Sequence, residues 1–258
     1  MLKTLLVPAL LAIAVSSRGM QTARPVPVIV ELFTSEGCSD CPPADGVLEQ
    51  FTVGQPIGGA EIIALGEHVD YWDRLGWKDR FSSAALTERQ QRYQARFNAE
   101  SIYTPQMVVD GRAELVGSDR NAARRAIERA LTAPHGVVRL TLQPSSAPSI
   151  VVDVTASDLP GLGRGDRADI IVAVTEDHLR SDVKRGENHG RILTHAAVVR
   201  HMATIGQAGA GGASSAHAEI PISPDWQRDA LKVVAFVQEQ RGRAILAAAA
   251  VALGNVRP

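Results

Sequence analysis

The chain has 258 residues, of which 45% are hydrophobic and 21% charged, and its formal net charge is -1. This near-neutral balance excludes the strongly basic proteins that bind nucleic acids or anionic membrane surfaces through charge alone. A length well above that of one small domain favours two domains.

The first residues have the pattern of an export signal. Lys3 supplies the positive start, an apolar core follows at 5–15, and small residues at 14–17 suit cleavage. That core is too short to cross a bilayer, which needs about 20 residues, so we expect no integral membrane segment in the mature chain. We therefore expect residues 1–20 to be a signal peptide and the mature protein to be periplasmic or secreted, where disulfides persist.

Between the signal segment and Pro134 the pattern alternates between strand and helix. The first strand is a β-branched apolar run of the kind buried in a sheet. The next segment has apolar residues at helical spacing, and Asp110-Gly111 indicates a hairpin turn between two later strands. The predicted order is strand, helix, strand, helix, hairpin and helix, at residues 26–34, 42–53, 61–69, 82–98, 106–115 and 118–133.

Polar residues of these helices have predicted places. Asp40 is expected to cap the first helix and Ser118 the last one. The arginines of the middle helix, Arg89, Arg92 and Arg96, lie on its polar face and are expected in solvent.

After Pro134 the sequence pattern changes to short apolar or alternating runs separated by turn residues. This pattern, with no clear helix, is typical of an immunoglobulin-like β-sandwich. The seven runs lie at 137–143, 149–157, 168–176, 192–202, 218–222, 231–240 and 243–253.

The only two cysteines, Cys38 and Cys41, lie where the first strand gives way to the first helix. The start of a helix favours negative charge, which lowers the pKa of a thiol and populates the attacking thiolate. We therefore predict Cys38 as the nucleophile and Cys41, one turn later, as the residue that resolves the mixed disulfide. Asp40 between them opposes thiolate formation at Cys38 and modulates the pair.

A threonine–proline pair, Thr104-Pro105, precedes the predicted hairpin. Together with the C-x-x-C, this layout resembles the thioredoxin fold, in which a cis-proline opens the strand that faces the two cysteines. The resemblance implies a cis bond at Pro105 and a backbone contact between Thr104 and substrate. The dipeptide Ser39-Asp40 differs from the Gly-Pro of thioredoxin, so the redox potential does not carry over.

Four stretches narrow the resemblance: "VELFTSEGCSDCPPAD", "HVDYWDRLGWKDRFS", "YTPQMVVDG" and "RGENHGRILTHAAVVR". Together they resemble a secreted thioredoxin-like family catalogued as domain of unknown function 1223. The resemblance covers nearly the whole mature chain and implies no known substrate. The expected fold class is therefore an α/β thioredoxin-like domain at 26–134 followed by an all-β, immunoglobulin-like sandwich at 135–258.

Two alternatives remain for the cysteine pair. A copper or zinc site would need help from His68 or from a carboxylate such as Asp70, as in a metal-binding or delivery protein. A permanently oxidised bridge would suit a binding or scaffold protein. A c-type haem site is excluded because Pro42, not histidine, follows Cys41.

Two further segments have open roles. Tyr71, Trp72 and Trp77 could form an apolar lip that binds an extended substrate, or could pin their loop to the core. The turn at 187–190 could stabilise the second half of the chain or its contact with the first half, or it could reach over the dithiol.

The sequence thus predicts an exported thiol–disulfide oxidoreductase that works through a mixed disulfide at Cys38. The expected substrate is a protein or a small thiol or disulfide, and the redox partner is not indicated. No organic cofactor is expected, since the chain has no phosphate-binding glycine loop. No nucleic-acid partner is expected either.

Overall fold

The computed structural model describes residues 24–145 and 148–255. The predicted signal peptide at 1–20 lies outside these ranges. Within them, no helix is long and apolar enough to span a membrane.

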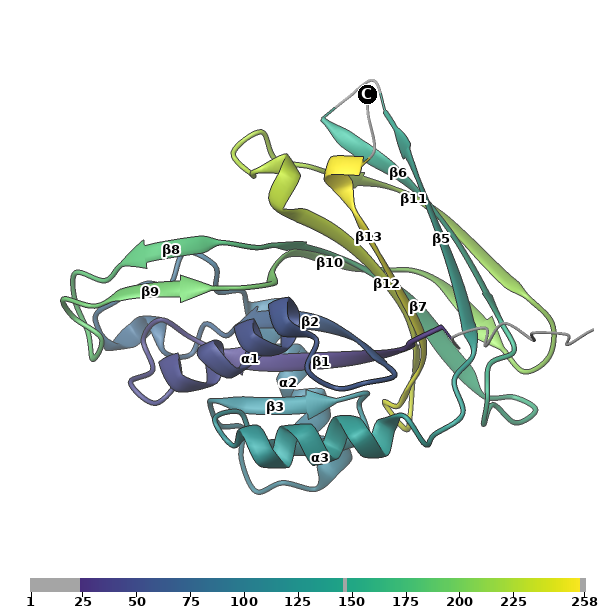
Figure 1. Ribbon diagram of the computed structural model, residues 1–258, viewed down its shortest axis with the longest axis horizontal. Coiled ribbons are helices and arrows are strands. Elements are labelled where there is room, and N and C mark those ends of the chain that lie inside the picture. Colours follow the sequence, from purple (N-terminus) through teal and green to yellow (C-terminus); the bar gives the residue numbers. More distant parts are fainter. Residues whose placement is uncertain (1–23, 146–147, 256–258) are drawn as a thin grey trace, which may run out of the picture.

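The first half of the described chain has four strands and three α-helices, in the order that the sequence predicts (Figure 1). The hairpin predicted at Asp110-Gly111 connects β3 and β4. The bounds are β1 Val26–Thr34, α1 Pro42–Gly54, β2 Ala60–His68, α2 Ala84–Phe97, β3 Gln106–Val109, β4 Ala113–Val116 and α3 Arg120–Ala130.

Strand β1 is covered on both faces of its sheet. On one face Val30 packs in a core with Leu48 of α1 and Ile127 of α3. On the other face Ile29 shares a core with Leu86 of α2. A strand covered on both faces has no solvent side, which explains its continuous apolar run.

The second half of the described chain consists of strands and short single-turn helices. Nine strands follow α3: β5 Val137–Pro144, β6 Ser149–Ser157, β7 Arg167–Glu176, β8 Leu179–Asp182, β9 Ile192–His195, β10 Val198–Gly209, β11 Ser214–Pro221, β12 Leu231–Glu239 and β13 Ile245–Ala252. The run at 192–202, predicted as one strand, is divided between β9 and β10 at Ala197, whose φ is 51°.

The expected fold class, a thioredoxin-like α/β domain followed by an immunoglobulin-like sandwich, is wrong. Strands of both halves form one mixed eight-stranded sheet in the order β13-β12-β7-β10-β2-β1-β3-β4. With thirteen strands and three α-helices among the described residues, the chain is mostly β. The division of the chain at residue 134 stays a prediction.

The two halves join where β10 pairs in parallel with β2, at Val198 and Gly66. A Cβ added to Gly66 would lie 3.0 Å from the carbonyl oxygen of Ala196, a contact tighter than side chains normally make. The Gly66 N–H donates to the Ala197 carbonyl at 2.7 Å. Glycine therefore lets the second half of the chain approach the backbone of β2 closely.

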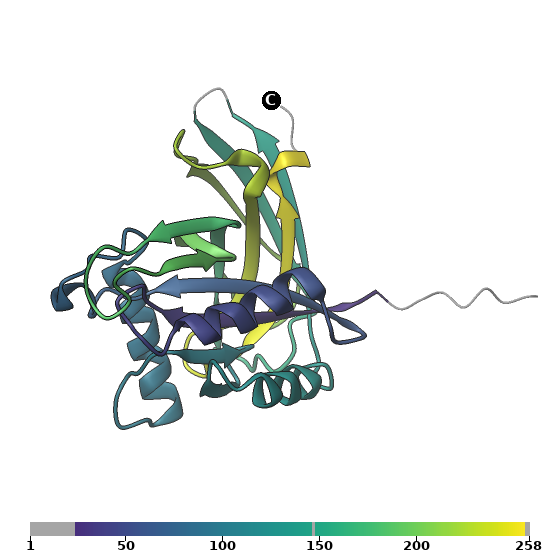
Figure 2. The same ribbon diagram turned by 60° about the vertical axis from the view of Figure 1, so that its left-hand side comes forward.

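Two smaller sheets complete the fold (Figures 1 and 2). The sheet β11-β6-β5 packs on the large sheet, where Val152 and Val154 of β6 share a core with Val172 of β7 and Val233 of β12. Every second residue of β6 is buried, as expected for a strand with one covered face. The β8–β9 ribbon lies beside α1.

Arg92 and Arg96 lie in solvent, as predicted, but Arg89 is buried, so its prediction is wrong. The buried Arg89 guanidinium donates from Nε to Glu31 Oε1 at 2.6 Å, and the same nitrogen lies 3.3 Å from Glu67 Oε1. Helical spacing alone cannot separate this arginine from its neighbours, because its partners come from β1 and β2.

Both predicted caps are also wrong. Cys41 rather than Asp40 precedes α1, and Asp40 is exposed. Asp119 rather than Ser118 caps α3, where its carboxylate accepts the Ala122 N–H at 2.8 Å.

Candidate functional site

The turn between β1 and α1 carries a disulfide. Cys38 Sγ is bonded to Cys41 Sγ, and the two Cα atoms lie 5.4 Å apart. The Cys41 carbonyl accepts the N–H groups of Ala44 at 2.9 Å and Asp45 at 3.1 Å, so the helix begins directly behind the pair. The dipole of that helix start favours a thiolate at this place, although the two prolines of its first turn supply no N–H groups.

Both cysteines are covered. Cys38 is 1% exposed and Cys41 is 0% exposed, so an attacking thiol reaches neither sulfur unless a neighbouring segment moves. One neighbour is the loop that contains Trp72, since a Cβ added to Gly37 would lie 3.0 Å from Trp72 Cβ.

The second neighbour is the β8–β9 loop, residues 183–191. Asn188 is fully buried and donates from Nδ2 to the carbonyl of Cys38 at 2.8 Å and to the carbonyl of Glu36 at 2.9 Å. Glu187 Oε2 accepts the Ser39 N–H at 3.2 Å. The turn at 187–190 therefore contacts the first half of the chain, and it does so at the disulfide turn.

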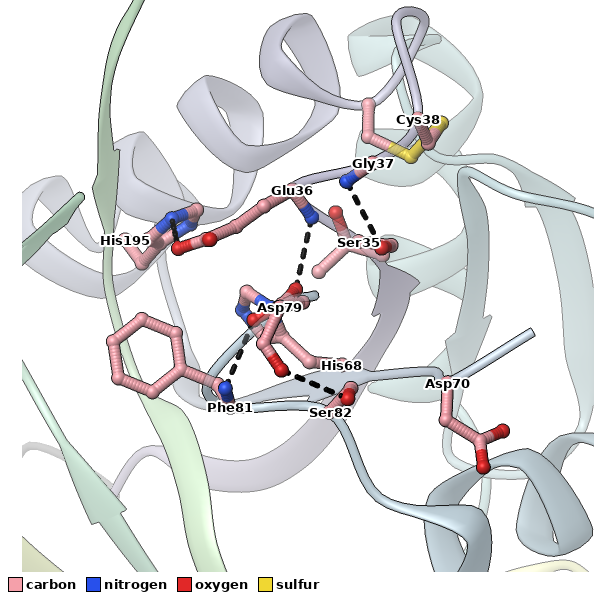
Figure 3. A network of polar contacts seen from close by, with 12 residues as sticks. Ser35, Glu36, Gly37, Cys38, His68, Asp70, Asp79, Phe81, Ser82 and His195 are labelled. Atoms are coloured by element: carbon pink, nitrogen blue, oxygen red, sulfur yellow. Dashed lines mark hydrogen bonds and ion pairs between the residues drawn. A yellow bond between two sulfur atoms is a disulfide. The ribbon is translucent and has the colours of Figure 1, made fainter. Parts of the chain in front are cut away.

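Buried ionisable side chains lie beside the disulfide turn (Figure 3). Asp79 Oδ2 accepts the Glu36 N–H at 2.9 Å and lies 2.6 Å from His68 Nδ1. Burial raises the pKa of Asp79, but the charge and hydrogen bond of His68 hold it below the ordinary value. The Asp79 carboxylate therefore connects β2 to the backbone that precedes Cys38.

His195 enters this network from β9. Its Nε2 lies 3.3 Å from Glu36 Oε1 and its Nδ1 3.8 Å from Asp45 Oδ2. Its ring packs edge-on against that of His68, with centroids 4.8 Å apart. Burial raises the pKa of Glu36, yet the surrounding donors, His195 first among them, hold it below its ordinary value.

The carboxyl group of Asp45 titrates near neutral pH. Burial raises its pKa to about 7, although His195 and Thr34 act in the opposite direction. Thr34 Oγ1 donates to Asp45 Oδ1 at 2.8 Å. Because Asp45 follows Cys41 by four residues, the two side chains share one face of the helix. A carboxyl group that changes its charge near pH 7 is thus aligned with the resolving cysteine.

The residues of the alternative metal site are not brought together. His68 pairs with Asp79 rather than with the cysteines. Asp70 Oδ1 accepts the Thr87 hydroxyl at 2.6 Å, and Figure 3 shows Asp70 apart from His68. Among the described residues, no group of three or more His, Cys, Asp or Glu is placed to hold a metal ion.

Trp72 and Trp77 are partly buried and hydrogen-bonded. Trp72 Nε1 donates to Thr104 Oγ1 at 2.9 Å, and Trp77 Nε1 donates to Glu36 Oε2 at 2.7 Å. The Tyr71 ring lies beside that of Trp72, with centroids 6.3 Å apart. These contacts pin the loop to the disulfide turn, and a substrate-binding role stays a prediction.

The Thr104–Pro105 bond is cis, as the family resemblance implied. Pro105 is buried beside α1, because a Cβ added to Gly117 would lie 3.1 Å from Ala44 Cβ and 3.3 Å from Pro105 Cβ. Thr104 reaches the disulfide turn through its hydrogen bond with Trp72.

Sequence reasoning missed Glu36, Asp45, Asp79 and His195. Asp45 did carry a signal, since its spacing of four residues from Cys41 places both on one helix face. His195 lies in the fourth stretch of the family resemblance, but its spacing did not point to the cysteines, because β9 meets α1 only in the folded protein.

Comparisons with other proteins complete the description of the site. The family described as protein of unknown function (DUF1223) matches residues 29–238. Among proteins of curated function there is no significant match. The crystal structure of AGR_C_4864 from Agrobacterium tumefaciens is 27% identical with a TM-score of 0.66, over 92% of this chain and 98% of that one. HBP35 of Porphyromonas gingivalis is 15% identical with a TM-score of 0.69, over 92% and 78%, which shows a shared fold alone.

Proposed function

Because the chain belongs to the DUF1223 family, whose description assigns no activity, we propose a function from the site itself: thiol–disulfide exchange through Cys38 and Cys41. One observation carries this proposal. The disulfide lies at the start of α1, and Asp45, whose pKa is about 7, follows on the same helix face. A carboxyl group that titrates near neutral pH, one helical turn from the resolving cysteine, suits proton transfer during exchange.

The exchange consists of two successive displacements at sulfur. A substrate thiolate attacks Cys38 Sγ, a bond forms between these two sulfurs, the Cys38–Cys41 bond breaks, and Cys41 leaves as a thiolate. A second substrate thiolate then attacks the substrate sulfur of the mixed disulfide, and Cys38 leaves as a thiolate. The substrate dithiol is oxidised and the protein disulfide is reduced. The reverse sequence, begun by the Cys38 thiolate, reduces a substrate disulfide.

Asp45 suits the proton transfer that accompanies this exchange. With a pKa of about 7, its carboxyl group can donate a proton to the departing Cys41 thiolate and can take one back when Cys41 attacks. His195 and Thr34 contact this carboxyl group from two other elements, which fixes its position.

A neighbouring segment must move before exchange begins, because both sulfurs are covered, and the β8–β9 loop is the segment that we expect to open. Its hold on the disulfide turn consists of the two hydrogen bonds of Asn188 and the one of Glu187. Hydrogen bonds of this kind contribute about 0.5–1.5 kcal/mol each, so breaking all three costs on the order of a few kcal/mol.

The expected place of action is the periplasm or the exterior of the cell. The charged and apolar pattern of residues 1–20 supports export. Disulfides such as Cys38–Cys41 persist in oxidising compartments. The substrate is a protein or a small molecule that carries a thiol or a disulfide.

The test is the reduction potential of the Cys38–Cys41 pair. The mature protein is equilibrated in graded glutathione buffers, and free thiols are trapped by alkylation, with Cys38→Ser as the control that cannot form the disulfide. A potential between about -120 and -270 mV supports exchange, and one below about -300 mV marks a structural disulfide and contradicts the proposal.

A further inference from the structure

A cavity of about 340 Å³ lies between the start of α2 and strand β10. Phe81, Met202 and Trp226 contribute apolar surface to its lining. The Phe81 ring also contacts the ring of His195, with centroids 5.7 Å apart (Figure 3). Phe81 thus stands between the cavity and the network beside the disulfide, so the cavity is a neighbouring but separate place.

Two guanidinium groups line this cavity and stack on one ring. The Cζ atoms of Arg80 and Arg200 lie 4.6 and 5.1 Å from the centroid of Phe81. Arg200 pairs with Glu176, Nη1 to Oε2, at 3.0 Å. Arg80 donates only to the carbonyl of Arg180 among the described hydrogen bonds, at 2.9 Å. No Asp or Glu lines the cavity, so one guanidinium charge has no carboxylate partner among the described residues.

The electrostatic surroundings favour an anion in this place. Burial lowers the pKa of Arg200, and the like charge of Arg80 lowers it further, against the effect of Glu176. Ser83 and Ala85 at the start of α2 line the same cavity, and the first turn of this helix has no acidic residue. The dipole of a helix start attracts negative charge, although Ser83 Oγ already accepts the Ala85 N–H, and an anion would also relieve the repulsion between the arginines.

We propose that this cavity binds a small oxyanion, a carboxylate or a phosphate monoester, attached to a flat apolar group. The planar guanidinium groups of Arg80 and Arg200 match pairs of oxygen atoms. Arg80 and Arg200 lie over the Phe81 ring, so Met202 and the half-buried Trp226 supply the apolar lining for the rest of the ligand. Half-buried His201, whose pKa is lowered by burial, supplies a neutral ring N–H beside the arginines.

Isothermal titration of the mature full-length chain tests the site, with inorganic phosphate, phenyl phosphate and benzoate as probes. Arg80→Gln removes the guanidinium that has no carboxylate partner and leaves the buried core intact. Arg92→Gln, on the exposed face of α2 and outside the cavity lining, removes the same charge and is the control. We expect Arg80→Gln to weaken binding about tenfold or more, because a charge-assisted hydrogen bond is lost, and Arg92→Gln to change it by less than about twofold.

The three probes also separate the sources of the oxyanion. Equal affinity for phosphate and phenyl phosphate identifies a site for free phosphate, and about tenfold tighter binding of an aromatic probe identifies an organic anion. Absence of saturable binding up to about 10 mM of every probe overturns the proposal. Equal weakening in both variants overturns it as well, because the attraction would then be that of overall charge.

Discussion

Two buried polar clusters lie on opposite faces of the same sheet, and they differ in their cations. The histidine cluster beside the disulfide consists of Glu36, Asp45, His68, Asp79 and His195. The arginine cluster under α2 consists of Glu31, Glu67, Arg89, Tyr93 and Gln238. Glu67 and His68 are adjacent in β2 yet belong to different clusters, since successive side chains of a strand point to opposite faces.

The arginine cluster is held by a permanent charge, whereas the histidine cluster can exchange protons. Arg89 stays charged at every physiological pH, and its buried guanidinium pairs with Glu31 and Glu67. The histidine cluster instead contains a carboxyl group with a pKa of about 7, Asp45. The first cluster therefore suits a structural role, and the second suits chemistry near neutral pH.

The largest expected effect is on the arginine cluster. Arg89→Leu leaves the buried Glu31 and Glu67 without their cation, and removal of one partner of a buried ion pair costs about 3–5 kcal/mol. Urea denaturation measures the loss in the free energy of unfolding. Arg92→Leu, at an exposed position of the same helix, should change it by less than about 0.5 kcal/mol. Equal stability of the two variants would show that the cluster is no structural tie.

The next effect is a pH dependence of stability in the histidine cluster. The folded protein holds the proton of Asp45 up to about pH 7, whereas the unfolded chain loses it near pH 4. The fold therefore binds more protons between these values, so this group makes the protein less stable as pH rises from about 4 to 7, with no further change above.

Asp45→Asn tests this dependence. From pH 4 to pH 8, the free energy of unfolding of the wild type should fall by about 1–4 kcal/mol relative to that of Asp45→Asn. Asp40→Asn, exposed in the same turn, is the control. Parallel pH profiles for wild type and Asp45→Asn would mean that Asp45 titrates at its ordinary pKa.

A smaller effect concerns the cover over the disulfide. Asn188→Ala removes both hydrogen bonds to the disulfide turn, so the loop should open more often and dithiothreitol should reduce the disulfide about tenfold faster, equivalent to about 1.4 kcal/mol. Stopped-flow reduction followed by alkylation measures the rate. His189→Ala, exposed in the same loop, should leave the rate unchanged. Identical rates in the two variants would remove the loop from the mechanism.

The smallest effect belongs to the exposed Asp40. Its charge lies in solvent, so Asp40→Asn should lower the pKa of the reduced Cys38 thiol by less than about 0.5 units. The pH dependence of the alkylation rate gives this pKa. A shift of more than about one unit would mean that Asp40 rather than the buried cluster controls the nucleophile.

Much of the local structure follows from the sequence. The spacing of apolar residues predicts the order from β1 to α3, and the cysteine pair is correctly expected at the start of a helix. These features depend on residues within one or two turns of each other, which periodicity and turn residues report directly.

The sheet and the site depend on contacts that local patterns do not report. The sequence by itself determined where the elements from β1 to α3 and the cysteine turn lie, because a few neighbouring residues set each of them. Only the tertiary structure decided that β10 passes Gly66 to join both halves, that Asn188 covers the disulfide, and that His195 meets Asp45. Such pairings depend on backbone approach and buried charge between distant segments, and no spacing along the chain encodes them.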